Sequence, residues 1–243
     1  MDVRIYKTAA EIGEAAGEVF VQQIINKPDC VLGLATGVTP IPMYTYIGNQ
    51  CKAGKVSLKK VTTFNLDEYC DLPITHRESY YAFMHRNLFD HTDILEENVH
   101  LLNGNAKDSD AECDAYEKAM AAAGGVDLQL LGIGTNGHIG FNEPSDEFSD
   151  GPFKVKLTES TIESNKIYFD TEDEMPRYAL TMGIGDIMRA KKIVFIATGE
   201  GKAKAVYDMI EGPVSPKCPA SVLQNHKDVI VFLDEGAAKL LKA

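Results

Sequence analysis

The 243-residue sequence predicts an α/β protein built on a doubly wound, mostly parallel sheet with helices on both faces. Short runs of Val, Ile, Leu and Phe alternate with amphipathic stretches, which is the pattern of βα units. These runs are nearly continuous rather than alternating, as expected for parallel strands buried on both sides. No linker, repeat or charge block interrupts the pattern, so we predict a single domain over residues 1–243.

The predicted elements follow in chain order. Apolar runs predict strands at Cys30–Ala35, Val61–Leu66, Val126–Ile133, Ile193–Thr198 and Val229–Asp234. Helical periodicity predicts helices at Ala9–Ile25, Ile41–Lys52, Glu78–Phe89, Ser109–Ala123, Ser160–Tyr168, Gly201–Glu211 and Ala237–Leu241. Ligands of such sheets bind outside the carboxyl ends of the strands, where the winding reverses. The residues that follow the strands are therefore the candidate site.

Composition narrows the class of partner. A formal net charge of -12 disfavours nucleic acid and membrane surfaces, and no basic cluster offsets it. No apolar run is long enough to span a bilayer, and the first residues lack the apolar core of a signal peptide. Five cysteines without a C-x-x-C pair fit reduced thiols. We expect a cytoplasmic protein with a small-molecule partner, and the sequence leaves a homo-oligomer open.

Two strand ends have the features of anion sites. Thr36-Gly37-Val38-Thr39-Pro40 leads into a helix, where backbone N–H groups and two hydroxyls would face an anion. A plain turn capped by Thr39 explains the same residues about equally well. The segment Gly199–Lys202 repeats the strand–loop–helix arrangement and adds a cation. Lys202 is unfavourable to the helix dipole there, so together the two loops indicate a phosphate-bearing ligand.

Asp67 and Glu68 are adjacent carboxylates at the end of another strand. One side chain should point toward the crevice and the other away. A partly desolvated carboxylate gains basicity and can remove a proton alpha to a carbonyl or imine. For an isolated pair of acids, two solvated loop charges would be the better interpretation, but the neighbouring loops favour catalysis.

The loop after the third predicted strand carries Asn136, His138 and Glu143. Its Gly132-x-Gly134-x-x-Gly137 spacing matches the dinucleotide fingerprint, but no helix plainly follows, so we expect no nicotinamide cofactor. His138 can act as acid and base near neutral pH, and Glu143 or Asn136 could orient its ring. The other histidines lack metal-ligand spacing, and we expect neither metal nor cofactor.

At these loops the sequence closely resembles the glucosamine-6-phosphate deaminase (isomerase) family. The matching segments, in order along nearly the whole chain, are Leu32–Pro40, Asn65–Tyr69, Gly132–Pro144, Ala179–Gly183 and Pro219–Ser221. The segment from Gly137 to Pro144 is the most specific of these. The resemblance implies a Rossmann-like fold of the deaminase and ribose-phosphate isomerase type, and a place in amino sugar metabolism.

The resemblance also implies a reaction and a role for each residue. An amino sugar phosphate would be opened, isomerised from aldose to ketose and deaminated to fructose 6-phosphate and ammonia. His138 would shuttle the ring-opening proton, held by Glu143 and Asn136, and Asp67 would move a proton from C2 to C1. The phosphate would bind to Thr36, Gly37, Val38, Thr39 and Lys202.

Three positions depart from the family pattern. Val38 replaces a small residue, so that position retains only its backbone N–H for a phosphate. Ile167 stands where the family has a phosphate-binding arginine, and we expect Lys166 or Lys154 to substitute for it as a point charge. Ser149–Phe153 replaces a basic segment used in allosteric control by some members, so we expect no such control here.

Alternatives from other classes stay open at this point. A deaminase for galactosamine 6-phosphate or another amino sugar is compatible with Ile167 and Val38. A hydrolase similar to 6-phosphogluconolactonase shares the fold but has no need of the Asp67 base. A non-catalytic sugar-phosphate-sensing domain would require a DNA-binding segment, for which there is no room before Cys30.

Overall fold

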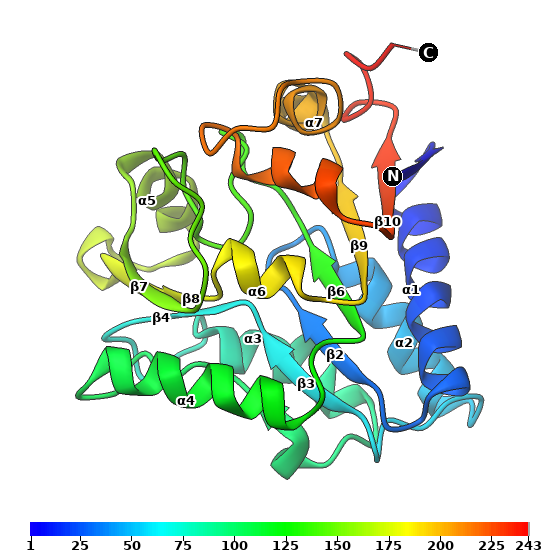
Figure 1. Ribbon diagram of the computed structural model, residues 1–243. Helices are drawn as coiled ribbons and strands as arrows, with labels where there is room; N and C mark the ends of the chain where they lie inside the picture. The colour runs from blue at the N-terminus through cyan, green and yellow to red at the C-terminus, as the bar shows by residue number, and fades with distance from the viewer. Residues whose placement is uncertain (243) are drawn as a thin grey trace.

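The structure, a computed structural model, describes residues 1–242 (Figure 1). The chain forms a seven-stranded parallel sheet and a three-stranded antiparallel sheet. Across the large sheet the strands run β1 (Asp2–Tyr6), β10 (Val229–Asp234), β9 (Lys192–Ala197), β6 (Leu128–Leu131), β2 (Val31–Leu34), β3 (Thr62–Asn65) and β5 (Val99–His100). The predicted fold class is confirmed, and each of the five predicted strands is present.

The winding of the large sheet reverses between β2 and β6. From β2 the chain adds β3 and β5 toward one edge, and it then returns to β6 and adds β9 and β10 toward the other. Because parallel crossovers are right-handed, this reversal places helices on both faces. On one face lie α1 (Ala9–Asn26), α2 (Ile41–Lys52) and α3 (Tyr80–Asn87), and on the other α4 (Ser109–Ala122), α6 (Ile184–Met188) and α7 (Ala203–Ile210) (Figure 1).

The helix boundaries follow local capping chemistry. The Thr8 hydroxyl accepts the Glu11 N–H and the Glu11 carboxylate accepts the Thr8 N–H, which closes a capping box at the start of α1. Ser79 caps α3, and the predicted longer helix breaks at Leu88 before a short 3₁₀ turn at Phe89–His91. The predicted helix at Ala237–Leu241 is wrong. Successive turns stand there, because so short a stretch near the chain end gains too few helical hydrogen bonds.

The smaller sheet was not predicted from the sequence. It pairs β4 (Asp67–Tyr69) with β8 (Tyr178–Thr181), which also pairs with β7 (Phe153–Lys156). Beside it lies α5 (Glu159–Asn165), which a 3₁₀ turn at Lys166–Tyr168 extends. A small second core fills this region; its buried members are Tyr69, Leu72, Phe141, Leu157, Ile162, Phe169, Met175 and Ala179. Since β4 follows β3 almost directly, Asp67 lies where the chain passes from one sheet to the other.

Within the described range, none of the helices is both long and apolar enough to cross a membrane.

Candidate active site

A cavity of about 600 Å³ opens at the carboxyl ends of β2 and β6, where the winding reverses. Eight of the nine residues predicted for the site line it; they are Thr36, Gly37, Val38, Thr39, Asp67, Asn136, His138 and Lys202. The ninth, Glu143, lies behind His138 and contacts it. The structure therefore brings together residues from four separate loops of the sequence.

The loop between β2 and α2 presents unused backbone donors to this cavity. Gly37 has a φ of 101°, a left-handed conformation that glycine adopts without steric cost. The N–H groups of Gly37, Val38 and Thr39 donate to no protein acceptor in the described part of the chain. With α2 beginning at Ile41, this loop has the donors and the helix dipole of an anion site.

Lys202 adds a positive charge to the same cavity. It ends a 3₁₀ turn at Glu200–Lys202 and immediately precedes α7. Burial lowers the pKa of its ammonium group. No carboxylate among residues 1–242 forms an ion pair with it, so the ammonium is available to an anionic ligand.

Asp67 is a buried carboxyl group with no protein hydrogen bond within the described residues. Only 6% of its surface is exposed, and burial, with a smaller contribution from the Glu68 charge, raises its pKa to about 8. Glu68 points away, as predicted, and accepts the N–H groups of Tyr69, Tyr80 and Tyr81 at 2.8–2.9 Å. Glu68 thus holds the first N–H groups of α3. Asp67 faces the cavity, and when it is ionised it is a basic carboxylate.

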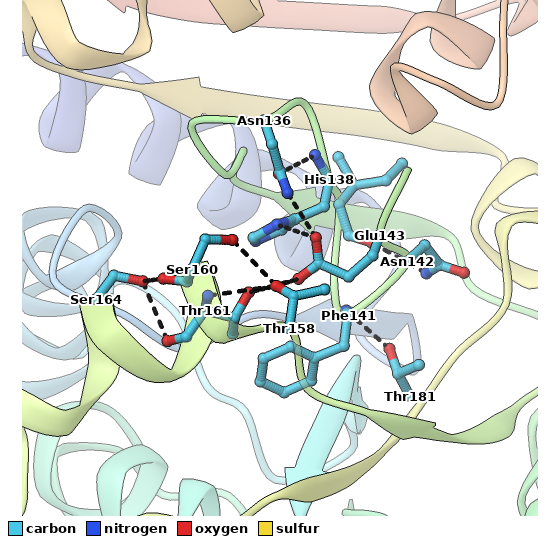
Figure 2. Close-up of polar contacts among 11 residues, drawn as sticks. Asn136, His138, Phe141, Asn142, Glu143, Thr158, Ser160, Thr161, Ser164 and Thr181 are labelled. Carbon is cyan, nitrogen blue, oxygen red and sulfur yellow. Dashed lines mark hydrogen bonds and ion pairs between the residues drawn. The ribbon is translucent and has the colours of Figure 1, made fainter. Parts of the chain in front are cut away.

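His138, Asn136 and Glu143 form a compact group on the opposite loop (Figure 2). The His138 Nδ1 lies 3.3 Å from the Glu143 Oε2, although this contact does not meet hydrogen-bond geometry. The Asn136 side-chain amide donates to the same carboxylate at 2.6 Å, and its oxygen accepts the backbone N–H of His138 at 3.2 Å. Burial alone would raise the pKa of Glu143, but His138, Thr161 and Asn136 together lower it to about 2. Glu143 therefore stays ionised beside the imidazole.

Helix α5 supplies groups that the sequence analysis missed. The Thr161 hydroxyl donates a short hydrogen bond to the Glu143 Oε1, and Thr158 donates to the same atom at 3.2 Å (Figure 2). Thr158 also caps α5. The run of hydroxyl residues is visible in the sequence, but it resembles an ordinary helix start, and no local signal links it to Glu143.

The expected substitutes for the family's arginine do not line the cavity. Ile167 is 72% exposed and lies outside it. Lys166 pairs with Glu163 at 2.8 Å, and the Lys154 ammonium lies 5.2 Å from the centre of the Tyr178 ring. The structure thus does not support either lysine in that role. The cavity instead includes Arg86 of α3, which sequence reasoning did not select.

Among residues 1–242, no group of three or more His, Cys, Asp or Glu side chains is arranged to hold a metal ion.

The fold and the strand-end site define a class of sugar-phosphate enzymes. Residues 6–232 match the family described as glucosamine-6-phosphate isomerases/6-phosphogluconolactonase, and the chain belongs to this family. Glucosamine-6-phosphate deaminases are similar over nearly its full length. The one from Thermoanaerobacter sp. (strain X514) is 48% identical over 99% of this chain and 95% of its own length, and the one from Clostridioides difficile (strain 630) is 47% identical over 99% and 97%.

Solved structures agree with this assignment. A monomeric glucosamine-6-phosphate deaminase superimposes with a TM-score of 0.96 at 41% identity, covering 99% of this chain and all of its own. The 6-phosphogluconolactonase from Trypanosoma brucei reaches a TM-score of 0.79 at 20% identity, covering 99% and 98%, which shows a shared fold only. The chain is therefore an enzyme of the family.

Proposed function

We propose that this enzyme is a glucosamine-6-phosphate deaminase that converts its substrate to fructose 6-phosphate and ammonia. The observation that carries the proposal is the pairing of two proton-transfer groups on one cavity. Asp67 offers a carboxylate that accepts no hydrogen bond from residues 1–242, and His138 lies against an ionised Glu143. The names of full-length relatives support the same activity.

His138 opens the sugar ring in this proposal. It removes the proton of the anomeric hydroxyl and returns a proton to the ring oxygen, leaving an open-chain aldehyde. The low pKa of Glu143, about 2, keeps a negative charge beside the imidazole throughout this exchange of protons. Asn136 holds both partners through its amide group.

Asp67 then isomerises the open chain. Its carboxylate takes the proton from C2 to give an enolamine and delivers a proton to C1, which leaves an iminium at C2. Water adds to that carbon, and ammonia departs as the ketone forms. A substrate ammonium beside Asp67 favours the ionised carboxylate, which offsets the effect of burial on the pKa of this group.

The phosphate is assigned to the loop at Thr36–Thr39 and to Lys202. The unused N–H groups and the α2 dipole favour a dianion there, and the Lys202 ammonium has no competing carboxylate within the described range. Val38 contributes its backbone only, and its side chain is 61% exposed.

Product analysis tests this function. The purified protein is supplied with glucosamine 6-phosphate, galactosamine 6-phosphate and 6-phosphogluconolactone in parallel. We expect ammonia and fructose 6-phosphate in equal amounts from the first. Turnover of the galactose epimer alone would reassign the substrate, lactone hydrolysis without ammonia release would assign a lactonase, and no turnover of either amino sugar would refute the deaminase.

A further inference from the structure

Arg86 is a cation of the cavity that the sequence analysis did not use. It lies near the end of α3, is exposed and lines the same cavity as Thr36–Thr39 and Lys202. Helix α3 packs against α2, whose first turn follows that loop. The guanidinium and the anion loop therefore belong to neighbouring elements on one wall.

The guanidinium keeps most of its hydrogen-bonding capacity. One nitrogen donates to the Arg77 carbonyl oxygen at 3.0 Å, which leaves four of its five N–H donors unassigned to any protein acceptor among residues 1–242. Arg77 in turn bonds to the Tyr168 carbonyl and to Asp170. Arg86 is thus anchored beside the segment that follows Ile167 without being neutralised.

Arg86 has no carboxylate partner within residues 1–242. The sequence has 36 acidic against 24 basic residues, so a surface arginine has acids within easy reach. Arg4, Arg77 and Arg189 each pair with at least one carboxylate. The other two arginines, Arg86 and Arg177, pair with none in the part of the chain that the structure describes, and of these two Arg86 lines the cavity. The same holds for Lys202. The cavity therefore contains two uncompensated cations from different elements.

We propose that Arg86 binds the phosphate group of the ligand together with Lys202 and is the guanidinium of this phosphate site. The proposal rests on the proposed function in one respect, that the ligand is a sugar phosphate. A guanidinium binds two phosphate oxygens at once, and a lysine supplies only a point charge. Arg86 is therefore expected to set affinity for the phosphate and to leave the proton transfers unchanged.

The test measures phosphate binding and turnover separately. Calorimetry with inorganic phosphate, and steady-state kinetics with glucosamine 6-phosphate, are carried out on wild type, Arg86→Gln and Arg86→Lys. Arg177→Gln is the matched control, because Arg177 is exposed, lies outside the cavity and undergoes the same change of charge. Thermal unfolding shows whether each variant is folded.

For Arg86→Gln we expect a rise of about 10- to 100-fold in both the phosphate Kd and the KM, with kcat within about twofold, as loss of a charge-assisted hydrogen bond predicts. Arg86→Lys should recover part of the loss, and Arg177→Gln should match wild type. Unchanged phosphate affinity in Arg86→Gln, or a wild type that does not bind phosphate, would overturn the proposal. If wild type binds phosphate through Arg86 but turns over no amino sugar, the deaminase fails and the phosphate site stands.

Discussion

The buried position of the Asp67 carboxyl group favours the proton transfer proposed for it but lowers the stability of the folded protein when the group ionises. Burial raises its pKa from 3.8 to about 8, so ionising this carboxyl group in the folded protein costs free energy. Between those values the folded state binds a proton that the unfolded state has released. The free energy of unfolding therefore falls as pH rises through this window, by at most about 1.4 kcal/mol per pH unit. Above pH 8, Asp67 is ionised in both states and contributes no further change.

The variant Asp67→Asn removes the proposed base and, with it, the free-energy cost of ionising a buried carboxyl group. We expect it to lose turnover and C2 proton exchange with solvent, and to raise the Tm by more at pH 9 than at pH 5. Calorimetric unfolding at several pH values measures the gain, with the exposed Asp114→Asn as the control for loss of one negative charge. A gain that did not depend on pH would show that Asp67 ionises as easily as a surface carboxyl group.

Gly134 leaves room for the His138 ring. A Cβ added at Gly134 would come within 2.2–2.4 Å of three ring atoms, whereas one added at Gly132 would meet only a carbonyl oxygen at 3.9 Å. Gly134→Ala should therefore displace the imidazole and lower kcat by about 100-fold or more, with the fold retained. Gly132→Ala lies in the same cavity wall and should keep near-normal kcat; equal effects of the two changes would remove the steric explanation.

At the scale of single residues, the sequence could predict site residues that directly follow a predicted strand. Asp67, Asn136, His138 and Glu143 lie at strand ends, where parallel sheets gather ligands, so their type and position were informative together. Thr161 and Arg86 were missed for the same physical reason. Each reaches the site only through tertiary packing, from α5 and α3, and neither stands at a strand end.

Among residues 1–242, the hydrogen bonds that join α5 and its capping residue to the loop carrying His138 all end on one side chain, Glu143. Thr158 and Thr161 hold its Oε1, and Asn136 holds its Oε2. Because Thr161 is buried and helps to lower the pKa of Glu143, the position of α5 and the charge beside His138 depend on each other.

The variant Thr161→Val tests this coupling. We expect faster hydrogen exchange over residues 159–165, a lower kcat and a higher pKa for the Glu143 carboxyl group, measured by NMR titration. Ser164→Ala is the control, since the Ser164 hydroxyl bonds only to backbone carbonyls of its own helix. If exchange and titration in Thr161→Val equalled those of the control, α5 would be held by its apolar contacts alone.

The strands that the sequence could predict are those with a continuous apolar run. All five central strands were found, because burial on both faces leaves a local signal. Strand β1 was missed because it lies at an edge with most residues exposed, and β5 has only two residues. The three-stranded sheet has short strands, and its β4–β8 pairing joins segments more than 100 residues apart, as Asp67 with Thr181. No local sequence signal sets the register of that pairing.

The net charge of the whole molecule does not describe the electrostatic field inside the cavity. A charge of -12 disfavours polyanions and anionic surfaces, but charges beyond about 8 Å are screened at physiological salt. In the proposed phosphate site, Lys202, Arg86 and the start of α2 would supply the positive field that a phosphate needs. That the chain forms one domain remains a prediction, and the two hydrophobic cores lie on either side of the junction at Asp67.

These two cores should contribute differently to stability and function. Tyr69, Phe141 and Phe169 belong to the small core and also line the cavity, whereas the large core stabilises the seven-stranded sheet. Met175 and Met209 are matched probes, because both are at most 1% exposed and lie in the small and the large core, respectively. Truncation of either to Ala should cost about 2–5 kcal/mol locally.

We expect Met209→Ala to lower the free energy of unfolding and leave the KM near wild type. Met175→Ala should raise the KM and speed hydrogen exchange in β4, β7 and β8, because the aromatic wall of the cavity rests on that core. Denaturant unfolding, peptide-resolved exchange and kinetics with glucosamine 6-phosphate separate the two effects. If both variants changed KM and global stability alike, the small sheet would belong to the same cooperative unit as the main core. The cavity wall would then not unfold locally while the rest of the molecule stayed folded.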